Sequence, residues 1–113
     1  MEKKQIDACW RMARISPQKL NEVVKRVRGK SLKQAISILD GIPRAVAPDV
    51  KKVVLSARAN AVHNFQRDPD TLFVLEATVG KNMVMRRRHI GGRSHSGEIR
   101  KLFSQLRIVL GEK

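Results

Sequence analysis

The residues best suited to chemistry in this sequence are cations gathered in one polar stretch. Guanidinium and ammonium groups bind phosphate oxygens through charge-assisted hydrogen bonds. His89 and His95 lie in the same stretch, where an imidazole can hydrogen-bond to or stack on a nucleobase. The stretch, residues 80–100, therefore predicts contact with a polyanion. Its cations, set against Glu98 alone, are Lys81, Arg86, Arg87, Arg88, Arg93 and Arg100.

The sequence contains no group of residues with the types and spacing of a catalytic or metal-binding site. The three histidines have no recognisable ligand spacing, and the single cysteine, Cys9, is far from all of them in the sequence. A single cysteine also excludes an intramolecular disulfide. The carboxylates are scattered, and no helix pattern follows Gly91-Gly92-Arg93 to hold a phosphate. The sequence therefore predicts no enzyme, no cofactor, no metal site and no small-molecule substrate.

The charge of the whole chain also predicts an anionic partner. The 113 residues carry 24 Lys and Arg against 10 Asp and Glu, for a formal net charge of +14. Residues 1–33 and 81–113 each carry a net charge of +7, whereas residues 34–80 are neutral. Such a distribution favours a scaffold that presents two cationic surfaces to nucleic acid or to an anionic membrane surface. No apolar run approaches the roughly 20 residues of a membrane span, so no membrane insertion is expected.

Three helices are predicted to hold the cations, two of them bounded by a capping serine and a glycine. Residues 17–28 follow Ser16 and stop at Gly29, and residues 32–39 follow Ser31 and stop at Gly41. A third helix runs from beyond residue 43 to about residue 64. The inward stripes at helical spacing are Leu20, Val23, Val24 and Val27, then Leu32, Ala35, Ile36 and Leu39, then Val46, Val50, Val53, Val54, Ala57 and Ala61.

Three segments alternate as strands: residues 5–13, 72–79 and 102–110. The sides predicted to face the core are Ile6, Ala8, Trp10 and Met12, then Phe73, Leu75, Ala77 and Val79, then Leu106, Ile108 and Leu110. The element order predicts one α+β domain over residues 1–113, with three helices packed on a small three-stranded antiparallel sheet.

The basic stretch lies between two good strands and is too polar for a core. A structureless loop of about 20 residues is uncommon inside a compact domain. We therefore predict that residues 80–100 form a projecting β-hairpin that turns near Gly91-Gly92, with arms of about 30 Å. The alternative is a basic loop that stays disordered until a polyanion orders it.

The sequence favours a large folded RNA as the polyanion. A DNA reader of the helix-turn-helix type is disfavoured, because the second helix of the pair 17–28 and 32–39 has only Lys33 and Gln34 facing outward near its start. A chain with 4% aromatic residues also has few rings on which bases could stack. Contacts to the backbone of a shaped RNA remain. The alternatives to such an RNA-binding protein are an architectural DNA- or RNA-binding protein and a basic adaptor on anionic membranes or acidic proteins.

Several motifs, in order along the chain, resemble the large-subunit ribosomal protein L-twenty-two family. The resemblance covers roughly residues 6–110 and is most specific in the third helix. The motifs are Ala13-Arg14-Ile15-Ser16-Pro17-Gln18-Lys19, Val27-Arg28-Gly29-Lys30, Ser56-Ala57-Arg58-Ala59-Asn60-Ala61-Val62-His63-Asn64, Ala77-Thr78-Val79-Gly80 and Gly92-Arg93.

The resemblance implies a structural protein of the large ribosomal subunit, with its globular part near the peptide exit and its hairpin in the wall of the nascent-peptide tunnel. Its implied partners are large-subunit ribosomal RNA, neighbouring ribosomal proteins and the nascent polypeptide. Together with the basic surfaces, it predicts an RNA-binding set: Lys3, Lys4, Arg11, Arg14, Ser16, Lys19, Lys25, Arg26, Arg28, Lys30, Arg58, Asn60, His63, Asn64, Lys81, Arg86, Arg87, Arg88, His89, Arg93, His95, Arg100 and Lys101.

The hairpin tip departs from the proline-containing tip of bacterial members. The candidates for the tunnel-facing tip are Met85, Arg86, Arg87, Arg88, His89, Ile90, Gly91 and Gly92. The stretch from Arg93 to Glu98 is about two residues longer than in common bacterial members. His89 followed by Gly92-Arg93, together with Asp68-Pro69-Asp70 and Gly80-Lys81, is closer to mitochondrial members, notably plant-like ones. This resemblance favours the mitochondrial matrix, while a bacterial or plastid ribosome stays open.

Overall fold

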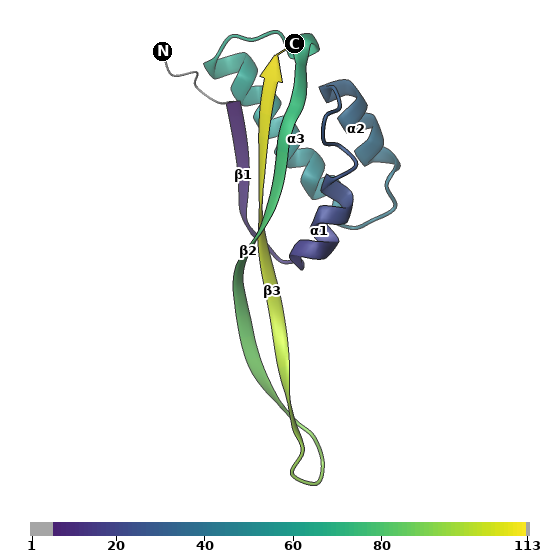
Figure 1. The fold of residues 1–113 in the computed structure, drawn as a ribbon, viewed down its shortest axis with the longest axis vertical. Coiled ribbons are helices and arrows are strands. Elements are labelled where there is room, and N and C mark those ends of the chain that lie inside the picture. The colour runs from purple at the N-terminus through teal and green to yellow at the C-terminus, as the bar shows by residue number, and fades with distance from the viewer. Residues whose placement is uncertain (1–5, 113) are drawn as a thin grey trace.

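The computed structural model describes residues 6–112, so the predicted contacts of Lys3 and Lys4 lie outside the described residues. The strands form one antiparallel sheet in the order β1-β3-β2 (Figure 1). This confirms the predicted α+β architecture. The elements are β1 (Ile6–Ala13), α1 (Pro17–Val24), α2 (Leu32–Gly41), α3 (Ala47–Asn64), the short 3₁₀ helix η1 (Pro69–Thr71), β2 (Leu72–Ile90) and β3 (Ser96–Glu112).

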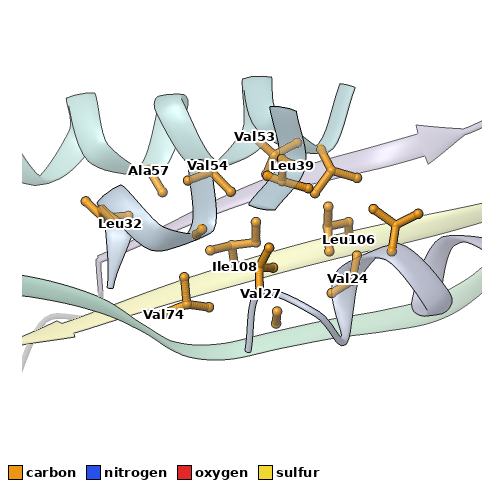
Figure 2. Packing of buried hydrophobic residues seen from close by; sticks show 14 of the residues in the cluster. Val24, Val27, Leu32, Leu39, Val53, Val54, Ala57, Val74, Leu106 and Ile108 are labelled. Carbon is orange, nitrogen blue, oxygen red and sulfur yellow. The ribbon is translucent and has the colours of Figure 1, made fainter. Parts of the chain in front are cut away.

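One hydrophobic cluster joins all three helices to one side of the sheet. Figure 2 shows Val54 and Ala57 of α3 facing Ile108 of β3, with Val74 of β2 and Val27 beside them. Ala57 and Ala61 are completely buried, so their small side chains let α3 lie close to its neighbours. The predicted inward stripes of the helices are buried in this cluster, except that Ile36 is half-buried.

A β-bulge near the end of β1 exchanges the side chains that face the core with those that face solvent, relative to the sequence prediction. Trp10 pairs with Leu106 and Ala13 with Ser104, so β1 contains one residue more than β3 between these two pairs. The extra residue reverses the alternation, because side chains alternate with a period of two. Ala13 is therefore buried, and the prediction that Met12 faces the core is wrong, since Met12 is half exposed.

A second bulge, near the start of β2, exchanges the buried and exposed side chains there relative to the sequence prediction. Val74 pairs with Leu110, while Glu76 pairs with the adjacent Val109, so Leu75 is the extra residue on β2. Val74 is buried and Leu75 is 54% exposed, which corrects the predicted inward placement of Phe73 and Leu75. Beyond the bulge, Ala77 faces the core as predicted.

The first helix is shorter than predicted because its last residues run beside β2. Regular α-helix ends at Val24, and the chain continues to Gly29 in tighter turns. The backbone N–H of Gly29 donates to the carbonyl of Val74 over 3.0 Å, and the N–H of Val74 donates to the carbonyl of Lys30 over 2.8 Å. Val27 still reaches the core, and Gly29 has the positive φ expected of a helix-ending glycine.

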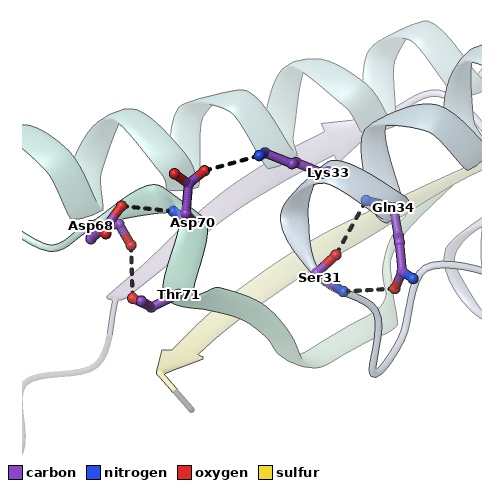
Figure 3. A network of polar contacts seen from close by, with 6 residues as sticks. All are labelled: Ser31, Lys33, Gln34, Asp68, Asp70 and Thr71. Carbon is purple, nitrogen blue, oxygen red and sulfur yellow. Dashed lines mark hydrogen bonds and ion pairs between the residues drawn. The ribbon is translucent and has the colours of Figure 1, made fainter.

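Local polar contacts fix where α2 begins and how it meets the turn before β2 (Figure 3). The Gln34 backbone N–H donates to the Ser31 hydroxyl over 3.3 Å, and the Gln34 side-chain oxygen accepts from the Ser31 backbone N–H. This reciprocal pair is a capping box. Lys33 forms a 3.4 Å ion pair with Asp70, which links α2 to η1.

The hairpin prediction is confirmed. β2 and β3 remain paired far past the point where β1 ends, and they leave the globular part as a two-stranded ribbon (Figure 1). The molecule measures 63 × 34 × 19 Å, and its radius of gyration is 17.4 Å, against roughly 13 Å for a compact chain of about this length.

Candidate nucleic-acid interface

The ribbon carries no part of the hydrophobic core. Between Lys81 and Phe103 none of the described side chains belongs to the buried cluster, and most are exposed. A bare two-stranded ribbon is marginal in water, because it buries little apolar surface. The ribbon therefore presents its cations to the surroundings along its whole length.

Strand alternation gives the ribbon two chemically different sides. On one, the arginine side, Arg86 lies opposite Arg100 and Arg88 lies opposite Glu98. On the other, the mixed side, Met85 lies opposite Lys101 and Arg87 lies opposite Ile99, with His89 opposite Gly97. Met85 and Ile99 are 47% and 41% exposed, so the mixed side offers apolar surface between its cations.

The ribbon turns at residues 91–95. The backbone N–H of Gly91 donates to the carbonyl of His95 over 2.7 Å, and that of His95 donates to Gly92 over 3.3 Å. Arg93 and Ser94 both have positive φ, as in the mirror-image turns that match the twist of hairpin strands. Among the predicted tip candidates, Gly91 and Gly92 lie in this turn and Ile90 adjoins it, while residues 85–89 lie within β2.

The base of the ribbon is fastened to β1 and to the segment before α1. Ser104, completely buried, donates from its hydroxyl to the carbonyl of Ile15 over 3.0 Å. Asn82, at a bulge of β2, donates to the carbonyl of Arg11. The sequence analysis missed both residues, because their partners are about 70 to 90 positions away and nothing local marks them.

Arg14 and the start of α1 lie at this base. The Arg14 guanidinium donates to the carbonyl of Leu102 over 3.2 Å and lies 5.3 Å from the centre of the Phe103 ring. Ser16 caps α1 by accepting from the backbone N–H of Lys19. The Lys19 side chain is exposed, so the predicted cations Arg14 and Lys19 flank the point where the ribbon leaves the domain.

Arg28 fastens the segment after α1 to the edge of β2. Its Nε donates to the carbonyl of Ala77 over 2.6 Å, and its Nη2 donates to the side-chain oxygen of Asn21 over 2.5 Å. Its neighbours Lys25, Arg26 and Lys30 are exposed. This group forms a second basic surface on the globular part, above the ribbon base.

The predicted residues of α3 are not gathered with the others. Asn60 donates to the carbonyl of Asp7 over 3.1 Å and accepts from Asn64, so it fastens α3 to β1. Arg58 and His63 are exposed. Figure 1 shows the end of α3 on the side of the globular part away from the ribbon, so any RNA that contacts both must extend along the whole molecule.

Ion pairs leave most ribbon cations uncompensated. The described part of the chain has exposed pairs at its helical end, such as Arg44–Glu22 at 2.9 Å and Arg67–Glu112 at 3.1 Å. On the ribbon, Glu98 alone supplies a carboxylate. Residues 6–112 contain no group of three or more potential metal ligands, and none of their helices is long and apolar enough to cross a membrane.

A family model and several known proteins match most of this chain. The family model described as ribosomal protein L22p/L17e matches residues 8–111. The large ribosomal subunit protein uL22 of Gluconacetobacter diazotrophicus is 48% identical over 106 residues, covering 94% of this chain and 79% of that protein. The uL22 of Rhodospirillum centenum is 42% identical over 113 residues, covering 100% and 86%, and that of Beijerinckia indica is 48% identical over 105 residues, covering 93% and 81%.

Proposed function

The chain belongs to the ribosomal protein L22p/L17e family, and from that premise we propose that it binds large-subunit ribosomal RNA through its basic ribbon and the cations at the ribbon base. As a member of this family it is a structural constituent of the large ribosomal subunit and not an enzyme. Family membership decides against the two alternatives, an architectural protein outside the ribosome and a membrane or acidic-protein adaptor.

The single observation that carries the RNA proposal is the ribbon itself. It projects from the domain, buries no core residue and presents seven cations against one carboxylate over residues 81–101. Such a structure adds little to folding, and its self-repulsion is relieved by phosphates. Contacts of Arg and Lys with the RNA backbone then fix the position of the domain. The neutral helical part holds the two basic surfaces in a fixed relative position.

The proposal includes the surroundings of the ribbon. We place the globular part near the peptide exit beside neighbouring ribosomal proteins, and the ribbon in the wall of the exit tunnel, where its tip meets the nascent polypeptide. The length of the ribbon supports this arrangement, since an arm without its own core can pass between RNA segments. The exposed apolar side chains of the mixed side suit contact with a polypeptide.

The compartment is a finer part of the proposal. The relatives named above are bacterial. The mitochondrial matrix therefore stays a prediction from the form of the tip, and an antibody applied to purified mitochondria and to the remaining cell fractions would test it.

The proposal is tested by sedimentation of a native lysate through sucrose gradients at two salt concentrations, with the chain followed by antibody. We expect co-migration with the large subunit that survives a moderate salt wash. A chain that stays at the top of the gradient, or leaves the particle at modest salt, would contradict integral RNA binding.

A further inference from the structure

The arginine side of the ribbon contains a carboxylate shared by two arginines. Glu98 Oε1 lies 3.3 Å from Arg86 Nε, and Glu98 Oε2 lies 3.5 Å from Arg100 Nη2. Each carboxylate oxygen therefore contacts one guanidinium. Arg86 and Arg100 are direct partners across the two strands, so Glu98 bridges a facing pair of like charges.

Without that bridge the two guanidiniums would repel each other. Like charges directly opposite in a sheet are unfavourable, and long exposed side chains separate to reduce the repulsion. The ion pairs with Glu98 join Nε of Arg86 and Nη2 of Arg100 to its two carboxylate oxygens. Because a guanidinium has five N–H donors, each arginine keeps most of its donors for another anion.

Beside this pair lies a shallow, open depression of the ribbon surface. The depression, of about 410 Å³, is lined by Arg86, Arg87, Arg88, Ser96, Gly97 and Glu98. Arg88, directly opposite Glu98, forms no ion pair within residues 6–112 and adds another cation to the wall.

We propose that Glu98 is a positioning residue that holds Arg86 and Arg100 as a two-guanidinium clamp for an RNA phosphodiester, with Arg88 beside it. The ligand is a backbone phosphate, since its charge and its unesterified oxygens match the N–H donors that the clamp leaves free. The clamp rests on the proposed RNA binding and deepens it, because it assigns a carboxylate to an RNA-binding surface.

For the change Glu98→Gln, the clamp and the net charge of the ribbon predict opposite changes in RNA affinity. Glu98→Gln raises the positive charge of the ribbon, so simple attraction to RNA predicts tighter binding. Loss of positioning predicts weaker binding by about two- to fivefold, the range expected for an exposed ion pair. The matched control is Glu22→Gln, which removes the same charge and breaks the Arg44 pair far from the ribbon; it is expected to bind as tightly as the wild type or more tightly.

The experiment measures dissociation constants of the full chain for in vitro transcribed large-subunit RNA of Gluconacetobacter diazotrophicus at fixed salt. If the wild type fails to bind, the proposed function fails and the clamp with it. If the wild type binds and Glu98→Gln binds equally or more tightly, only the clamp is overturned.

Two further measurements separate positioning from simple stabilisation of the ribbon. Glu98→Asp keeps the charge but is too short to reach both guanidiniums, so the clamp predicts weakened binding, whereas binding at the wild-type level would overturn it. Amide hydrogen exchange of residues 84–102 in the complex should be unchanged in Glu98→Gln. Faster amide exchange in Glu98→Gln would mean that the weaker binding comes from melting of the ribbon, and it would also overturn the clamp.

Discussion

Ser104 is the fully buried polar side chain at the junction of domain and ribbon. Its hydroxyl supplies the donor for the Ile15 carbonyl over 3.0 Å. Ser104→Ala leaves that carbonyl without its donor, and we expect a loss of about 1–3 kcal/mol in the free energy of unfolding. Urea denaturation followed by circular dichroism would measure it. The control Ser37→Ala, at an exposed position of α2, should change stability by less than about 0.5 kcal/mol, and equal effects of the two variants would contradict the role of Ser104.

Single residues were predictable from sequence where their partners are local. The caps Ser16 and Ser31 accept from backbone groups three residues ahead, so spacing alone reveals them. Arg28 was predicted only as a site residue, and its bond to Ala77, 49 residues away, has no local signal. The same holds for Glu98, whose position in the sequence shows an acid among bases but not the two arginines that it joins.

Alanine spacing on α3 determines how closely this helix approaches the sheet. Ala57 is completely buried, whereas Ala59, two residues later in the same helix, is exposed. Ala57→Leu forces extra volume into a packed layer, and we expect a loss of about 1–3 kcal/mol. Ala59→Leu is the matched control and should be close to neutral, because both residues are good helix formers. Thermal unfolding of both variants tests this, and a neutral Ala57→Leu would mean that α3 can move away from the sheet freely.

Elements were predictable wherever one periodicity persists without interruption. The three helices and the last strand follow their stripes, so their buried faces agree with the sequence. The first two strands do not, because bulges near Met12 and at Leu75 insert one residue and exchange the two sides. Apolar residues occur on both sides of each bulge, so alternation continues past it in the sequence and conceals the shift.

The shape of the whole molecule followed from the absence of core residues. Residues 80–100 were too polar for a core and too long for an ordinary loop, which left a projecting hairpin or a disordered segment. The structure has the hairpin, because β2 and β3 stay paired from the domain into the ribbon, through the bulges at Leu75 and Asn82. The RNA-binding roles could not be read in this way, since they depend on a partner outside the chain.

Removal of the outer ribbon should separate folding from RNA binding. Residues 83–95 contain four arginines and no core residue. Their deletion should therefore leave a cooperative unfolding transition with nearly the wild-type midpoint. RNA affinity should fall, and the slope of log affinity against log salt should decrease by about 3, as expected for four lost phosphate contacts.

A full-length variant separates the charge of the ribbon from its shape. With Arg86, Arg87, Arg88 and Arg93 all changed to Gln, the strands can still pair, but the same four charges are lost. We expect the same decrease in salt slope as in the deletion, because counterion release counts neutralised phosphates and not contact area. Loss of cooperative unfolding in the deletion variant would show that the ribbon supports the domain. An unchanged salt slope in both variants would place the RNA contacts on the surface around Arg28 and α1 instead.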